Sequence, residues 1–167
     1  MRLAFGILFS VIIVAMIVCA RIARKSGNRM GFAAACLLTA LILPMAGNGI
    51  IIVSGNRTFS LIGCYMYYLG LDVSIAALVY YTYVYCQITK PANWFRNAAY
   101  FLLLADMIQL LLNPFLHHAF EITEIEVDGF PYFKMIPHMG QQFHRIIDYL
   151  ILAGVIVVFI VKLIRAD

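Results

Sequence analysis

The amino-acid sequence predicts an all-α integral membrane protein, a helical bundle of about five transmembrane helices with its N-terminus outside and its C-terminus in the cytoplasm. Two observations predict this class. Hydrophobic residues make up 64% of the 167 residues and charged residues only 12%, against about 45–50% and about 25% in soluble domains. The charges are also clustered, which leaves apolar runs long enough to cross a bilayer as helices.

The first three apolar segments differ in character. Residues 3–20 end at a basic cluster, which favours an uncleaved anchor over a signal peptide because the strong positive charge follows the apolar run. Residues 30–53 contain Pro44 and the pair Gly47 and Gly49, which we expect to loosen the outer half of that helix. Residues 59–86 form the longest segment and are rich in tyrosine, as is typical of interhelical packing and of interfacial belts.

The last two apolar segments, 98–113 and 146–164, flank the one long polar stretch of the chain. We expect this stretch, residues 117–145, to be an outer loop. Pro114 lacks an amide hydrogen and should end or kink the preceding helix. His117 is therefore expected off the helical face, near the outer mouth of the bundle.

Lysine and arginine indicate the orientation of the spans. One set of connections carries eight basic residues, and the other set carries four basic residues together with four of the eight acids. Because cytoplasmic connections are enriched in Lys and Arg, the cytoplasmic set should be Arg21, Arg24, Lys25, Arg29, Lys90, Arg96, Lys162 and Arg165. The outer set is then Arg2, Arg57, Lys134 and Arg145 with Glu121, Glu124, Glu126 and Asp128.

Several activities are excluded by what the sequence lacks. It has no GxxxxGK[ST] loop, no GxSxG elbow and no CxxC pair, so we predict no enzyme and no catalytic residue. The net charge of +4 arises in short connections beside apolar segments, which is a topology signal, and no nucleic-acid partner is expected. The four cysteines lie in or beside apolar segments without a disulfide pattern and read as packing residues.

Acidic residues inside the predicted spans are candidate functional groups, because each costs about 2.5–3.5 kcal/mol at the bilayer centre. Helical spacing groups them with other polar residues into three stripes: Tyr65, Tyr68 and Asp72; Asp106, Gln109 and Asn113; and Gln141, His144 and Asp148 if the last helix extends outward by a turn. Such stripes should converge inside the bundle. They would form either an outward-opening polar pocket or interhelical hydrogen bonds that hold the bundle together. The candidate ligand-binding residues are Asp72, Asp106, Gln109, Asn113, His117, His144 and Asp148.

The four histidines all fall within the outer stretch and its flank: His117, His118, His138 and His144. Glu121 or Glu124 could complete a metal shell with them. Their spacing nevertheless matches no common zinc motif such as HExxH. We therefore expect no metal and no cofactor.

Five short motifs follow one another between residues 17 and 165. They are the basic end of the first span, the aromatic stretch 65–70 (YMYYLG), 113–117 (NPFLH), 128–132 (DGFPY) and 140–145 (GQQFHR) leading into Asp148-Tyr149. In this order and spacing the chain resembles the N-terminal seven-helix membrane input module of bacterial sensor histidine kinases and diguanylate cyclases. With Asp106, the last motifs look most like the versions fused to diguanylate cyclases.

The resemblance implies a sensory module in the bacterial inner membrane that detects an extracellular or membrane-phase signal. It would regulate a C-terminal cytoplasmic output domain, a diguanylate cyclase or histidine kinase, that is not present in this chain. Its other implied partners are the lipid bilayer and a small-molecule or lipid signal. It also allows a homodimer, although no GxxxG face argues for one. Because the family module has seven spans and this chain stops after five, we expect a fragment of a longer signalling protein.

Two other classes of function stay open from the sequence. The first is a small transporter or channel subunit in which Asp72 and Asp106 relay an ion or proton. Transporters often contain internal repeats, and none is visible here. The second is a membrane subunit that binds a metal or haem through the histidines.

Overall fold

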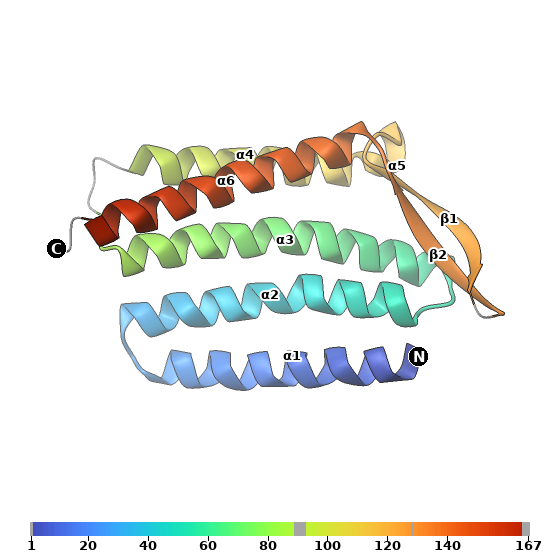
Figure 1. The fold of residues 1–167 in the computed structure, drawn as a ribbon, viewed down its shortest axis with the longest axis horizontal. Coiled ribbons are helices and arrows are strands. Elements are labelled where there is room, and N and C mark those ends of the chain that lie inside the picture. Colours follow the sequence, from blue (N-terminus) through green and yellow to red (C-terminus); the bar gives the residue numbers. More distant parts are fainter. Residues whose placement is uncertain (1, 89–92, 128, 165–167) are drawn as a thin grey trace.

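The computed structural model of the protein describes residues 2–88, 93–127 and 129–164. The chain is mostly helical, as the sequence predicts (Figure 1). In chain order its elements are α1 (Arg2–Lys25), α2 (Arg29–Val53), α3 (Arg57–Tyr85), α4 (Asn93–Leu111), α5 (Asn113–Leu116), β1 (Phe120–Val127), β2 (Phe130–Pro137) and α6 (Met139–Ile164).

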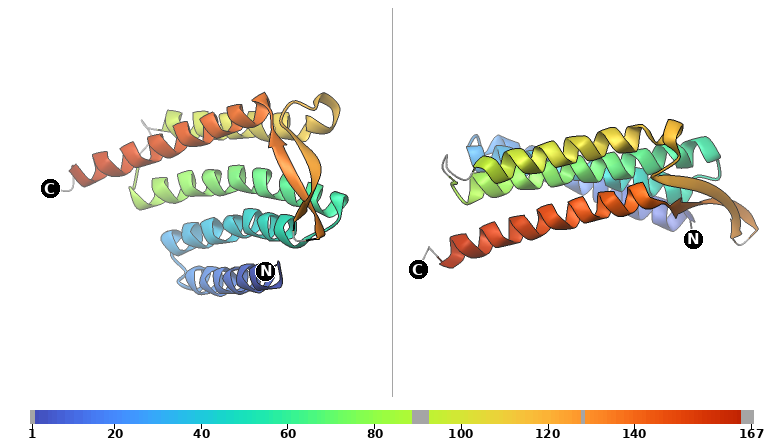
Figure 2. Two further views of the ribbon diagram at one scale, coloured as in Figure 1. Left: turned by 45° about the vertical axis from the view of Figure 1, so that its right-hand side comes forward. Right: turned by 90° about the horizontal axis from the view of Figure 1, so that it is seen from above.

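The long helices run side by side, and the strands lie across one end of the bundle. Helices α1, α2 and α3 form a row, and α4 and α6 lie along α3 on the side away from α2 (Figures 1 and 2). The C-terminal half of α6 diverges from α3 and α4 (Figure 2). Accordingly, Val155 is the last buried residue of α6. We call the end that carries β1 and β2 the hairpin end and the other end the opposite end.

Four helices in the described part of the chain are long and apolar enough to cross a membrane: α1, α2, α3 and α6. The segment predicted as a further span, 98–113, is also helical, within α4 and α5. Helix α4 is not among the four, because its 19 residues include Arg96, Asp106 and several uncharged polar side chains. It is the most polar of the long helices and lies against α3 and α6.

The structure differs from the sequence prediction over residues 117–145. This stretch contains two strands and the first turns of α6, so it is not simply a loop and the fold is not entirely helical. Strands β1 and β2 form an antiparallel hairpin whose register runs from Phe120 opposite Pro137 to Val127 opposite Phe130. Apolar and polar residues alternate along β1 except at Thr123 and Glu124, where two polar residues are adjacent. The sequence between the strands is Asp-Gly, a strong short-range hairpin signal. Gly129 has a φ of +76°, which glycine adopts without steric cost. Asp128 lies outside the described residues.

The hairpin is docked onto the helices at their ends. The Phe120 ring lies 5.3 Å from that of Tyr65 and 5.4 Å from that of Tyr68, measured between centroids. At the far tip, Arg2 Nη2 donates a hydrogen bond to the Pro131 carbonyl oxygen over 2.7 Å. The hairpin therefore spans from α6 across α3 to the start of α1, as Figure 1 shows.

Helices α2 and α3 approach closely through small residues. We expected Pro44, Gly47 and Gly49 to loosen α2, but α2 continues to Val53, and Pro44 and Gly47 are buried. A Cβ atom on Gly47 would lie 2.6 Å from the Gly63 carbonyl oxygen, and one on Gly70 would lie 2.6 Å from the Pro44 nitrogen. These residues thus serve close backbone packing between the helices.

Substitution of Gly47 by alanine should lower stability, because the new Cβ meets backbone atoms of α3 and the helices must separate. Overpacking of this kind costs about 1–3 kcal/mol. Reversible unfolding of the purified protein in detergent measures the change. Gly49→Ala is the matched control on the same helix, because its Cβ would make an ordinary contact at 3.4 Å with the Phe9 side chain. Equal stability of the two variants would contradict the close-packing account.

Candidate functional site

Four buried ionisable side chains meet inside the bundle, level with the middle of α3 and the first half of α6. Helix α3 contributes Asp72, α4 contributes Asp106, and α6 contributes His144 and Asp148. Their exposed fractions are 0%, 1%, 1% and 8%, and a potential ligand atom of each lies within 4.8 Å of those of the other three. We call these residues the Asp–His cluster.

His144 is the centre of the Asp–His cluster. Its Nδ1 lies 2.5 Å from Asp106 Oδ2 and 3.5 Å from Asp72 Oδ1, and its Nε2 lies 3.3 Å from Asp148 Oδ2. His144 and Asp148 share a face because they are four residues apart on one helix. This placement requires α6 to start before the apolar run at residue 146, and α6 does start at Met139.

Tyr68 and Gln141 form one wall of the cluster. The Tyr68 ring packs edge-to-face on the His144 ring, with centroids 5.2 Å apart. When the Gln141 amide is oriented so that donors meet acceptors, its oxygen accepts from the Tyr68 hydroxyl at 2.9 Å and from the Arg145 guanidinium at 3.0 and 3.1 Å. Packing and hydrogen bonding together restrict the orientation of the His144 ring.

Gln109 connects the cluster to the start of α6 and to the segment between α5 and β1. Its Nε2 donates to Asp106 Oδ1 over 2.8 Å and to the Gly140 carbonyl oxygen over 3.1 Å. Its Oε1 lies 2.7 Å from Nε2 of His118. A Cβ on Gly140 would be 2.9 Å from that same Oε1, so the first turn of α6 approaches Gln109 more closely than a side chain at position 140 allows.

The structure leaves two of the predicted site residues, Asn113 and His117, outside the cluster. Asn113 is buried, but its side chain serves the backbone: Oδ1 accepts from the Ala119 amide at 2.7 Å, and Nδ2 donates to the Phe120 carbonyl oxygen at 2.9 Å. His117 is exposed and ends α5 with a φ of 50°. The short helix α5, which contains Pro114, changes the direction of the chain after α4, so these residues do not continue the polar face of α4. Through its hydrogen bonds to Ala119 and Phe120, Asn113 instead fixes the start of β1.

The structure also adds residues that the predicted set omits. Tyr68 and Gln141 lie in the wall of the cluster, and helical spacing already places them in the same stripes as Asp72 and Asp148. His118 contacts Gln109 where His117 was expected. No sequence signal distinguishes His118 from His117, because the difference depends on the backbone turn at the end of α5.

A cavity of about 760 Å³ borders the cluster on the side of α2. Its lining comes from α2, α3, β2 and α6, and most of it is apolar. The polar groups at its surface include Tyr68, Gln141, His144, Arg145 and Asp148. A small solute in this cavity would therefore contact the imidazole of His144 and the carboxyl of Asp148.

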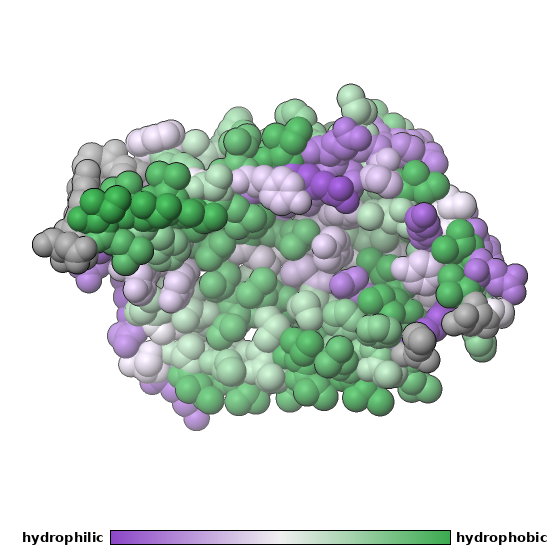
Figure 3. Space-filling model, viewed as in Figure 1, coloured by the Kyte–Doolittle hydropathy of each residue, from purple (hydrophilic) through white to green (hydrophobic). Residues whose placement is uncertain are grey.

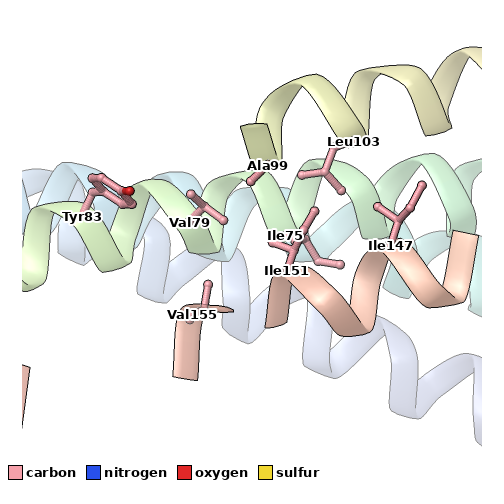
Figure 4. Packing of buried hydrophobic residues seen from close by; sticks show 8 residues of the cluster. All are labelled: Ile75, Val79, Tyr83, Ala99, Leu103, Ile147, Ile151 and Val155. Carbon is pink, nitrogen blue, oxygen red and sulfur yellow. The ribbon is translucent and has the colours of Figure 1, made fainter. Parts of the chain in front are cut away.

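An apolar core fills the space between the cluster and the opposite end (Figure 4). Its buried members are Ile75, Val79 and Tyr83 of α3, Ala99 and Leu103 of α4, and Ile147, Ile151 and Val155 of α6. Two buried hydroxyls of α3 in this region, those of Ser74 and Thr82, donate to carbonyl oxygens of their own helix. In the described part of the chain, the ionisable cluster thus does not continue through this core.

Comparison of the chain with protein-family models, curated proteins and solved structures finds no match. Fold and site together define a mostly helical protein with four helices that could span a membrane and a buried Asp–His cluster. The resemblance to seven-helix input modules stays a prediction from the sequence motifs alone.

Proposed function

We propose that this chain is a multi-pass protein of the bacterial inner membrane that acts as a sensory input module. In this proposal the hairpin end faces outward, and the Asp–His cluster binds the signal. The bound signal alters the packing of α3, α4 and α6, and this change regulates a cytoplasmic signalling output, a diguanylate cyclase or histidine kinase.

The exterior of the bundle supports the membrane part of the proposal. Ala20 is the only buried residue of α1, and exposed Leu, Ile and Val side chains cover that helix. Hydrophobic residues cover most of the face in Figure 3, with hydrophilic ones gathered toward the two ends. An apolar surface of this extent is typical of a lipid contact.

The charges at the two ends support the orientation. The described basic residues of the predicted cytoplasmic set lie at the opposite end: Arg21, Arg24, Lys25, Arg29, Arg96 and Lys162. Glu121, Glu124 and Glu126 lie on the hairpin. Lys90 and Arg165, which belong to the same predicted set, lie outside the described residues. The excess of basic residues at the opposite end favours its placement in the cytoplasm.

The apolar core between the cluster and the opposite end is the observation that favours a sensory function over a transport function. A relay for ions or protons needs polar groups on both sides of a central acid. Here Asp72 lies midway along α3, and the buried residues between the acids and the opposite end are mostly apolar, among them Val79, Leu103 and Ile151. This arrangement suits a ligand that enters and leaves on the same side.

Helix α6 offers a route from the site to the output. It contains His144 and Asp148 near its start and continues to the opposite end. A ligand that binds one packing of α3, α4 and α6 better than another shifts their populations by its difference in affinity. A small movement at the cluster would then be transmitted along a rigid helix.

Orientation can be measured by cysteine labelling in a variant that lacks the native cysteines. Glu124→Cys on the hairpin should react with an impermeant maleimide in intact spheroplasts. Ser26→Cys, an exposed position at the opposite end, should react only after lysis. The reverse pattern, or equal labelling of both, would overturn the proposed topology.

Signal transmission can be tested in the same background with spin labels at Tyr85 and Leu163, which are exposed near the C-terminal ends of α3 and α6. Asp72→Asn removes a buried charge as a bound cation or proton would, and should shift the distance between the labels. Ser10→Ala on the outside of α1 should leave it unchanged. An unchanged distance in Asp72→Asn would overturn coupling between the cluster and the opposite end.

Transport can be tested in proteoliposomes that contain a pH-sensitive dye, with a potential imposed by potassium and valinomycin. The sensory proposal expects proton entry no faster than in protein-free liposomes. Entry that exceeds this background and disappears in Asp106→Asn would overturn the proposal in favour of a transporter.

A further inference from the structure

The charges of the Asp–His cluster are unbalanced. Three carboxyl groups face one imidazole in a region that is almost fully buried. The guanidinium of Arg145 is directed to the Gln141 oxygen. Buried carboxylates require neutralisation by protons, by a cationic side chain or by a bound cation.

Unsatisfied oxygens in the cluster indicate where a cation would fit. Neither carboxylate oxygen of Asp72 has a hydrogen-bond donor among the described residues, and the same holds for Asp148 Oδ1. Asp72 instead faces the carboxyls of Asp106 and Asp148. By contrast, Asp106 is satisfied by Gln109 on Oδ1 and by His144 on Oδ2. Asp72 thus has no closer polar contact than His144 Nδ1 at 3.5 Å and the neighbouring Asp106 carboxyl, in a centre already surrounded by potential ligand atoms.

We propose that the cluster binds a single divalent ion of a first-row transition metal. Asp72, Asp106 and Nδ1 of His144 are the protein ligands, and water completes the shell. Asp148 lies against the other ring nitrogen and orients the imidazole. This proposal names the signal for the sensory function proposed above and rests on that function for its biological meaning.

The distances between the ligand atoms fit such a site. Metal bonds of about 2.0–2.2 Å to nitrogen and oxygen place tetrahedral ligands about 3.4 Å apart. His144 Nδ1 is already 3.5 Å from Asp72 Oδ1. Its 2.5 Å contact with Asp106 Oδ2 must widen by about 1 Å, and the proton held in that hydrogen bond must leave. Binding therefore requires a small displacement of α6 relative to α4.

Groups around the ligands complete the arrangement typical of metal centres. A ligating histidine usually contacts a carboxylate through its other nitrogen, and ligating carboxylates are themselves hydrogen-bonded. Asp148 Oδ2 lies 3.3 Å from Nε2 of His144. Gln109 Nε2 donates to Asp106 Oδ1, and the Tyr68 ring packs against the imidazole.

The donor set selects the kind of metal. Two carboxylates and one imidazole, without a thiolate, suit Zn²⁺, Mn²⁺ or Fe²⁺, whereas Mg²⁺ and Ca²⁺ prefer oxygen ligands alone. The order of stability for divalent ions places Zn²⁺ above Mn²⁺. We therefore expect Zn²⁺ to bind more tightly than Mn²⁺, and Mg²⁺ to bind weakly.

Metal binding to the full chain in lipid nanodiscs, after removal of metals with a chelator, tests the proposal. Calorimetry should detect one Zn²⁺ per chain. Asp72→Asn and His144→Gln should each weaken binding at least tenfold, because each removes a ligand. His138→Gln and Glu121→Gln are matched controls in an exposed pair 3.7 Å apart on the hairpin side, and should bind as the unsubstituted chain does. Loss of binding in the controls instead of the cluster variants would assign the metal to the surface and overturn the proposal.

Electron paramagnetic resonance of bound Mn²⁺ gives a test that does not depend on the folding of a variant. The unsubstituted chain should show coupling of Mn²⁺ to one imidazole nitrogen, and a spectrum without nitrogen coupling would overturn the proposed ligand set. In the spin-labelled chain, Zn²⁺ should change the distance between the labels at the positions of Tyr85 and Leu163. Zn²⁺ bound at the cluster without that change would overturn the sensory function and leave the metal site standing. If Asp72→Asn shifts the distance between the labels but the unsubstituted chain binds no metal, the metal site alone would be overturned.

Discussion

Replacement of Val157 by lysine should sharply reduce the amount of folded protein in the membrane fraction. Val157 lies within the apolar part of α6 and is 56% exposed, so under the proposed topology the ammonium group would face lipid. Lysine near the centre of a membrane-spanning helix costs about 2.5–3.5 kcal/mol on insertion scales, which corresponds to about 100-fold in an equilibrium constant. Extraction of membranes with mild detergent, followed by size-exclusion chromatography, measures the folded amount.

Leu163→Lys is the matched control for this substitution. It places the same residue on the same helix, at an exposed position beside Lys162, where the side chain can extend to the membrane surface. It should accumulate nearly as the unsubstituted chain does. A water-facing α6 would tolerate lysine equally at both positions, so normal accumulation of Val157→Lys would contradict the proposed span.

The helices could be predicted from hydropathy, but their ends could not. The last apolar run begins near residue 146, whereas α6 begins at Met139. Its first two turns contain Gln141, His144 and Arg145, which bond or pack against α3, α4 and the hairpin. Hydropathy reports the part of a helix that can face lipid, and these turns face protein.

The hairpin could have been predicted from the sequence. The Asp-Gly pair after the mixed polar and apolar stretch of β1 is typical of a two-residue hairpin, and the polar composition of the same stretch suggested a loop. Its docking could not be read from that signal. The pairing of Phe120 with Tyr65 and Tyr68, and of Arg2 with Pro131, joins residues far apart in the chain.

The candidate site was predictable only helix by helix. Spacing of three and four residues places Asp106 with Gln109 and His144 with Asp148, because periodicity holds along one helix. Periodicity does not show which helices pack together, so the contact between Asp72 and His144 is known only from the tertiary structure. The periodicity of α4 also ends before Pro114, where the short helix α5 begins, so the contacts of Asn113 and His117 in α5 and at its end could not be assigned correctly.

Replacement of His144 by leucine should strongly destabilise the metal-free protein. The imidazole pairs with the carboxyls of Asp106, Asp72 and Asp148 and is 1% exposed. Removal of one partner from a buried ion pair typically costs about 3–5 kcal/mol, because the other partner stays buried without compensation. Unfolding in detergent with excess chelator measures the loss and excludes a contribution from bound metal.

A double-substitution cycle separates this pairing from the loss of packing. Asp106→Leu combined with His144→Leu removes both members of the closest pair, so the double variant should be more stable than the sum of the single effects predicts. Additive losses, or a loss below about 1 kcal/mol for His144→Leu, would contradict pairing at the cluster. A large interaction energy between His144 and Asp106 also matters for function. It would mean that a cation can bind only by breaking a contact that stabilises the metal-free protein. Helix α6 would then respond to binding because the contact between His144 and Asp106 is the one that has to open.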